Sequence, residues 1–79
     1  MKASISINKE IIGEKIKNLR LKRFLTMRDL GKEIHASVSQ ISKWENGQNV
    51  PNLPHVINIC NFFEISIDYL IISTHDLDH

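Results

Sequence analysis

Residues 26–47 read TMRDLGKEIHASVSQISKWENG, a pattern that predicts two short helices joined by a tight turn. Apolar and small residues recur at helical spacing over residues 27–34, which indicates a helix with one buried face. The next helix is expected to begin at Ser37, where a capping-box pattern starts, and to end at Asn46-Gly47, because glycine accepts the left-handed conformation that ends a helix. Only two residues separate the helices, so the helices must cross at a steep angle.

The first of these helices has its own start signal and one unusual interior residue. Thr26 can cap it, with Asp29 completing an imperfect capping box in which Glu or Gln is usual. Gly31 lies inside the helix, where glycine costs about 1 kcal/mol relative to alanine. We therefore interpret Gly31 as a point that another helix approaches closely.

Three further helices are predicted on either side of this unit. Asn8 can cap a helix that runs to about Phe24, Asn52 can cap another, and Ser66 can cap a last short one. Residues 65–72 stay open between helix and strand, because the start of this segment also alternates in polarity. The residues expected on buried helix faces are Ile12, Ile16, Leu19, Met27, Leu30, Gly31, Ile34, Ile41, Trp44, Val56, Ile59, Cys60 and Phe63. The last short helix is expected to contain Ile67, Leu70 and Ile71, and the expected solvated face of the first helix is Lys15, Lys17 and Lys22.

Length and composition limit the architecture to one small unit. The 79 residues allow one domain, which we expect to be all-α and compact, with five helices over residues 8–72. Residues 1–7 alternate as an extended arm would, and residues 73–79 are expected to form a frayed tail. The single cysteine excludes an internal disulfide. No apolar run approaches the roughly 20 residues that cross a bilayer and no signal peptide is apparent, so we expect a cytoplasmic protein without a membrane partner.

The charge is distributed unevenly along the chain. Residues 1–50 hold all ten Lys and Arg and five acidic residues, whereas residues 51–79 hold four acids and no base. A basic half suits a polyanion, although a solvated surface would carry the same charges. A protruding helix about 10–12 Å across fits the major groove of B-DNA, about 12 Å wide. The residues expected to face outward from the second helix of the pair are Ser37, Val38, Ser39, Gln40, Ser42 and Lys43.

A set of residues at fixed spacing extends this pattern over roughly residues 11–72. The set comprises Leu25-Thr26-x-x-x-Leu30-Gly31-x-x-Ile34, then Ser37-x-x-x-Ile41-Ser42-x-Trp44-Glu45-Asn46-Gly47, then Pro51, together with Asn18-Leu19-Arg20 and Ile65-Ser66-Ile67-Asp68-Tyr69-Leu70. It resembles the lambda-repressor-like (Cro/repressor, xenobiotic-response-element) helix-turn-helix regulators. The resemblance implies a five-helix fold in which helices 2 and 3 form the helix-turn-helix, and a function in binding double-stranded DNA.

The resemblance also assigns roles to individual residues. It implies an ion pair between Arg20 and Glu45 that fixes the reading helix against the first helix. Contacts to bases are expected from Val38, Ser39, Gln40 and Lys43, and contacts to the DNA backbone from Met27, Ser37, Ser42, Asn46, Gln48 and Asn49. For Val38, packing on the preceding helix and contact with a thymine methyl are equally compatible with the sequence.

Three positions depart from the family pattern. Gln is common where Met27 stands, so one phosphate contact is in doubt, and alanine is usual at Gly31. Glycine is usual at His35, where the turn requires a positive φ that strains histidine.

We expect a transcriptional regulator, most often a repressor in this family, that acts as a homodimer on an inverted repeat. The residues expected to form the dimer interface are Ile67, Tyr69, Ile71 and Ile72. The alternative is an antitoxin-like or phage-type interaction protein that uses the same fold to bind another protein. No cofactor, metal ion or small-molecule ligand is expected, the metal-friendly side chains of residues 75–79 lying in the frayed tail, and no arrangement of nucleophile and base indicates an enzyme.

Overall fold

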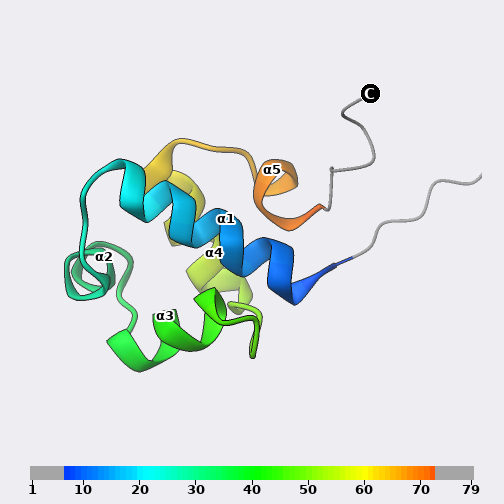
Figure 1. The fold of residues 1–79 in the computed structure, drawn as a ribbon. Coiled ribbons are helices and arrows are strands. Elements are labelled where there is room, and N and C mark those ends of the chain that lie inside the picture. Colours follow the sequence, from blue (N-terminus) through cyan, green and yellow to red (C-terminus); the bar gives the residue numbers. More distant parts are fainter. Residues whose placement is uncertain (1–6, 73–79) are drawn as a thin grey trace, which may run out of the picture.

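The structure, a computed structural model, describes residues 7–72, and the chain forms five α-helices there (Figure 1). The described residues contain no strand beyond a single antiparallel bridge between Ile7 and Ile72. The predicted all-α class with five helices is therefore confirmed. The helices are α1 (Lys9–Lys22), α2 (Met27–Ile34), α3 (Val38–Glu45), α4 (Leu53–Phe63) and α5 (Ile67–Ile71).

Every helix begins directly after a short polar residue that accepts a hydrogen bond from an amide of the first turn. In α1 the Oδ1 atom of Asn8 accepts from the amide of Ile11 at 3.0 Å, and in α5 the Oγ atom of Ser66 accepts from the amide of Tyr69 at 3.0 Å. These local signals were readable from the sequence because each involves residues only three apart. The observed N-caps, all predicted, are Asn8, Thr26, Ser37, Asn52 and Ser66.

Each of the first four helices is followed, within two residues of its end, by a residue in the left-handed region. Three of these residues are not glycine, namely Phe24, His35 and Glu64, with φ near +60°, and the fourth is Gly47. The α1 helix ends at Lys22, two residues before the predicted end at about Phe24. Phe24 reverses the chain instead, because its amide donates to Leu21 O at 3.0 Å and the amide of Leu25 donates to Arg20 O at 3.2 Å, the double hydrogen bond of a Schellman motif.

One apolar core lies between the helices. Trp44 is 3% exposed and Cys60 is 5% exposed, so the sequence-based view of both as core residues is correct. Burial raises the pKa of the Cys60 thiol and keeps it neutral. The buried apolar residues are Ile12, Ile16, Leu30, Ile34, Ile41, Trp44, Val56, Ile59, Cys60, Phe63 and Leu70.

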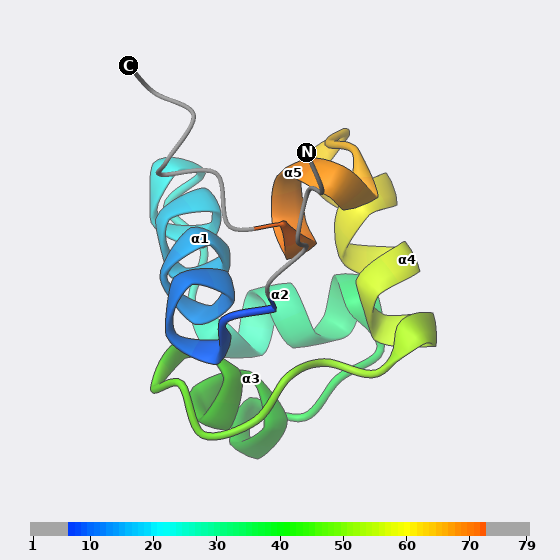
Figure 2. The same ribbon diagram turned by 90° about the vertical axis from the view of Figure 1, so that its right-hand side faces the viewer.

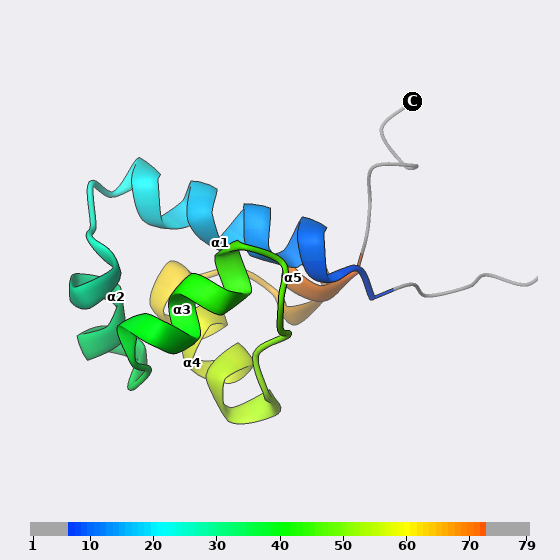
Figure 3. The same ribbon diagram turned by 60° about the horizontal axis from the view of Figure 1, so that its bottom comes forward.

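The packing leaves α3 at the periphery of the molecule. The α1 helix packs against α3 and α5, α2 packs against α3 and α4, and α4 packs against α5. Figure 2 shows α1 and α4 on opposite sides with α2 between them, and α3 below α2 at the edge. The view from below in Figure 3 shows α3 in front, with no other helix covering it on that side.

The segment 65–72, left open between helix and strand, contains both. Ile67–Ile71 form α5, and Ile72 is extended and makes the bridge to Ile7. Lys15 holds this end of the chain, because its Nζ atom donates to the carbonyl oxygens of Tyr69 at 2.6 Å and of Ile72 at 3.0 Å. Lys15 was expected on a solvated face; it is half-buried instead, and desolvation lowers its pKa. The expected extended arm and frayed tail, apart from Ile7, lie outside the described residues.

Candidate nucleic-acid interface

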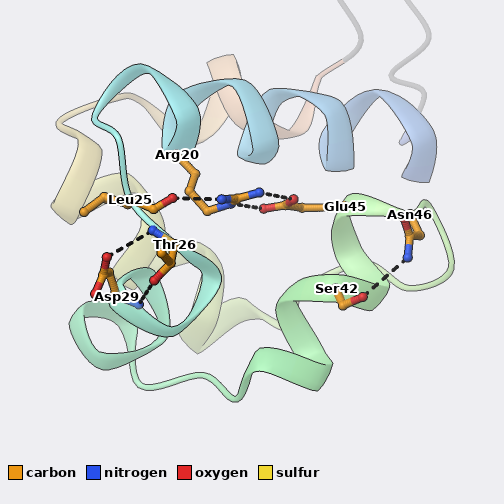
Figure 4. Close-up of polar contacts among 7 residues, drawn as sticks. All are labelled: Arg20, Leu25, Thr26, Asp29, Ser42, Glu45 and Asn46. Atoms are coloured by element: carbon orange, nitrogen blue, oxygen red, sulfur yellow. Dashed lines mark hydrogen bonds and ion pairs between the residues drawn. The ribbon is translucent and has the colours of Figure 1, made fainter.

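Both helices of the tight pair begin with a complete capping box. In α2 the Oγ1 atom of Thr26 accepts from the amide of Asp29 at 3.0 Å, and Oδ2 of Asp29 accepts from the amide of Thr26 at 3.1 Å (Figure 4). Asp29 thus performs the reciprocal role that Glu or Gln usually fills. Hydrogen bonding to the Thr26 amide lowers the pKa of the Asp29 carboxyl. The amides of Met27 and Arg28 in the first turn have no partner within the helix, and helix N-termini of this kind suit phosphate groups.

The capping box at the start of α3 leaves the amide group of the Gln40 side chain free. Its Oε1 atom accepts from the amide of Ser37 at 2.9 Å, while Oγ of Ser37 accepts from the amide of Gln40 at 3.0 Å. The carbonyl end of Gln40 is therefore committed to the helix start, and only its amide group is available to donate to a ligand.

The turn between the two helices has the left-handed residue that the sequence predicts. His35 has φ 60° and ψ 46°, a conformation that costs a non-glycine residue about 1–2 kcal/mol. Gly31 makes the turn possible, because a Cβ atom there would collide with the carbonyl oxygen of Ala36 and lie 3.5 Å from Ile41 Cδ1. The expected close approach at Gly31 is thus made chiefly by the turn itself, and not by the body of another helix.

The two sides of α3 differ sharply in exposure. Ile41 is 0% exposed and Trp44 is 3% exposed, whereas Val38 is 44% exposed. For Val38, packing on the preceding helix and contact with a thymine methyl were both left open. Its side chain is partly covered and partly exposed, which agrees with both interpretations. The other outward residues, Ser37, Ser39, Gln40 and Lys43, are exposed, and Ser42 is half-buried. Met27, by contrast, packs against the core, so its main-chain amide is better placed than its side chain to meet a ligand.

The loop after α3 folds back onto the helix end. Gly47, with φ +75°, reverses the chain, and the amides of Gln48 and Asn49 donate to Lys43 O at 2.9 Å and 3.4 Å. Nδ2 of Asn46 donates to Oγ of Ser42 at 3.4 Å (Figure 4). The side chains of Asn46, Gln48 and Asn49 are exposed, beside the end of α3.

Arg20 and Glu45 connect α1 to the last residue of α3 (Figure 4). Nε of Arg20 donates to Glu45 Oε2 at 2.7 Å and Nη2 donates to Oε1 at 2.9 Å, while Nη1 donates to Leu25 O at 2.8 Å. The side chains are only 10% and 3% exposed, and the hydrogen bond to Glu45 raises the pKa of Arg20. This bidentate geometry fixes both the distance and the orientation of α3 relative to α1.

Several residues that position this unit were missed by the sequence analysis. A Cβ atom at Gly13 of α1 would collide with the carbonyl oxygen of Trp44 in α3. Nη1 of Arg23 donates to Phe62 O at 3.1 Å, and the guanidinium group lies over the rings of Phe62 and Phe63. Their partners lie far away in the sequence, and the sequence carries no local signal for them.

Within residues 7–72 there is no pocket and no group of three or more His, Cys, Asp or Glu that could hold a metal ion. The metal-friendly residues 75–79 lie outside this range. Among the described helices, none has the length and apolar character needed to span a bilayer.

Comparisons with known proteins show which proteins share this sequence pattern and this arrangement of helices. A family model described as helix-turn-helix matches residues 16–70. The HTH-type transcriptional activator BcrR of Enterococcus faecalis is 38% identical over 59 residues, which are 75% of this chain and 29% of that protein. The chain therefore spans less than a third of the length of this relative.

Two solved structures show the same arrangement of helices. The P22 c2 repressor in complex with a synthetic operator superposes with a TM-score of 0.74 and 31% identity, covering 77% of this chain and 92% of the repressor chain. The SOS-response repressor LexA from Eubacterium rectale superposes with a TM-score of 0.79 over 86% of this chain and 72% of that chain. At 24% identity, the LexA match speaks for the fold alone.

Proposed function

Because the chain belongs to the lambda-repressor-like helix-turn-helix family of DNA-binding transcriptional regulators, which is not an enzyme family, we propose that it binds double-stranded DNA sequence-specifically through α3. The observation that carries the proposal is the two-sidedness of α3. Its inner residues are in the core and its outer residues are short, polar or basic, without an acid. The capping boxes and the Arg20–Glu45 pair support it by giving this surface a fixed orientation.

We assign contacts with bases or with phosphates to each group according to its position in the structure. Side chains on the exposed face of α3 read base edges in the major groove, with Gln40 donating from its amide group. The helix N-termini and the loop after α3 meet phosphates, which supply affinity but little discrimination. We assign base contacts to Val38, Ser39, Gln40 and Lys43, and backbone contacts to the Met27 main chain, Ser37, Ser42, Asn46, Gln48 and Asn49.

A helix of eight residues is about 12 Å long and meets only three or four base pairs, so we propose a homodimer on an inverted repeat with half-sites about 34 Å apart. Ile67 and Tyr69 are 42% and 49% exposed, and they form the proposed dimer contact. Ile71 and Ile72 were also expected at this interface. Both are half-buried, so we place them at the edge of the proposed dimer contact.

We propose repression as the regulatory outcome. The support is the similarity to the P22 c2 repressor, which is 31% identical and covers 77% of this chain in a structure with its operator, whereas BcrR, 38% identical over 59 residues, is an activator. A reporter gene placed behind the bound sequence tests the sign, since expression falls on repression and rises on activation.

Selection from a random pool of duplex DNA tests the whole proposal. We expect enrichment of one motif with two-fold symmetry, bound with an affinity that falls steeply as salt rises. A pool that yields no motif would overturn sequence-specific binding and favour the alternative, in which the fold binds a protein partner.

A further inference from the structure

Two side chains of α4 hold the turn of the helix-turn-helix from outside. Nδ2 of Asn58 donates to the carbonyl oxygen of Ile34, the last residue of α2, at 3.1 Å. Nε2 of His55 lies 3.2 Å from the carbonyl oxygen of His35, the left-handed residue of the turn. A carbonyl oxygen only accepts, so Nε2 of His55 carries the proton. We call His55 and Asn58 the α4 bracket.

The α4 bracket acts at the C-terminal end of α2. The last carbonyl groups of a helix have no partner within that helix. At the end of α2, the amides of His35 and Ala36 both donate to Gly31 O. The carbonyl oxygens of Ile34 and His35 are then satisfied from α4, which packs beside α2 (Figure 2).

His55 also touches the recognition helix. Its ring lies 5.1 Å from the ring of Trp44, centroid to centroid, at an interplanar angle of 59°. Trp44 is buried at the inner side of α3, whereas His35 is in the turn that precedes α3. A single side chain of α4 therefore contacts the turn and α3 together, and it links the end of α2 to the placement of α3.

The hydrogen bonds of the α4 bracket hold a turn that contains a strained residue, His35. Histidine occupies a left-handed conformation, φ 60°, that glycine adopts without strain. We propose that His55 and Asn58 are positioning residues for DNA recognition: their hydrogen bonds keep the His35 turn in the conformation that aligns α3 with the groove. This inference rests on the proposed function, since the alignment matters only if α3 reads DNA.

The first test compares the α4 bracket with a matched position on the same helix. His55→Phe keeps an aromatic ring beside Trp44 and removes the donor to His35, and Asn58→Ala removes the donor to Ile34. Asn61→Ala is the control, because Asn61 is exposed on α4. We expect each bracket variant to bind the duplex selected by the wild-type chain about fivefold more weakly, the effect of one hydrogen bond. The Asn61→Ala protein should bind as the wild type does.

A second test separates positioning from general destabilisation. With His35→Gly the turn is unstrained, so the same bracket substitutions should cost little affinity in that background, and His55→Phe should be largely rescued. Base discrimination is the companion readout: the bracket variants should lose more affinity for the selected duplex than for a scrambled one, because contacts with base edges carry the discrimination and need an exact alignment of α3, whereas phosphate contacts carry no sequence information. Equal losses on both duplexes, or no rescue by glycine, would overturn the inference.

A third measurement needs no DNA and keeps the two proposals distinguishable. The amide of Ala36 donates to Gly31 O across the turn at 3.0 Å, and its hydrogen exchange reports whether the turn opens. We expect faster exchange at Ala36 in both bracket variants and unchanged exchange at Ile16 in the core. If exchange at Ala36 is unchanged, the positioning role is wrong even where DNA binding is found. If exchange rises but the pool yields no motif, the α4 bracket holds the turn and the failure belongs to the proposed function.

Discussion

The backbone of α1 at Gly13 lies directly against the carbonyl group of Trp44 in α3. A Cβ atom at this position would collide with Trp44 O and lie 3.2 Å from the Cα atom of Glu45. This contact lies beside the Arg20–Glu45 ion pair, so α1 and the end of α3 are joined by both packing and charge. The orientation of α3, and with it the proposed reading surface, depends on this junction.

Gly13→Ala is expected to destabilise the protein. Alanine favours a helix over glycine by about 1 kcal/mol, but overpacking at a tight contact costs about 1–3 kcal/mol. We expect a net fall in the free energy of unfolding, measured with urea. The control is Asn18→Ala on the exposed part of α1, where alanine should be neutral or stabilising. A Gly13→Ala protein more stable than the wild type would contradict the close approach.

The Arg20–Glu45 pair is expected to show strong coupling. Each partner is nearly covered, so Arg20→Met alone or Glu45→Leu alone leaves an uncompensated charge and should cost about 3–5 kcal/mol in urea unfolding. The double variant should lose less than either single one, because no buried charge remains. Its affinity for the selected duplex should still fall, since the bidentate contact no longer orients α3. Additive losses in stability would contradict the coupling.

The sequence revealed the parts of this fold that are set locally. Helix starts such as Ser66 depend on residues three apart, and the left-handed conformation of His35 was implied by the resemblance, because the family usually has glycine there. Phe24 was missed because its bulky side chain gives no sign of a left-handed helix end.

Long-range contacts explain the rest of what the sequence did not reveal. Lys15 was expected on a solvated face because its two partners, the carbonyl groups of Tyr69 in α5 and of Ile72 after it, lie 54 and 57 residues later. His55 and Asn58 carry no local signal in the sequence, because their partners His35 and Ile34 lie 20 and 24 residues away. The sequence predicts α3 as a helix with one exposed face because α3 has its own periodicity, but the side chains of Arg20 and His55 that contact α3 come from α1 and α4.

Lys43→Ala tests the assignment of the reading surface against another exposed lysine. We expect a loss of about 1–3 kcal/mol in binding the selected duplex if Lys43 meets a base, with weaker discrimination at one position. Lys22→Ala is the matched control: it lies nine residues after Gly13, on the side of α1 opposite the α3 contact. Equal losses for both variants would indicate a diffuse electrostatic contact in place of base recognition.

The dimer proposal makes a separate prediction. Ile67→Asp and Tyr69→Asp should convert the dimer to a monomer in sedimentation experiments, because a charge in an apolar contact is costly. Ile57→Asp on α4 is the control, since Ile57 and Ile67 are equally exposed, at 42%. If the wild-type chain is a monomer with and without the selected duplex, the symmetric dimer is wrong.

Amide chemical shifts, followed by NMR as the selected duplex is added, would show directly which surface meets DNA. Large changes are expected at residues 37–43 and at the first-turn amides of α2, with small changes across the α4 surface around Asn61. If the changes instead gathered on α5 around Ile67 and Tyr69 and left α3 unperturbed, recognition of DNA by α3 would be refuted.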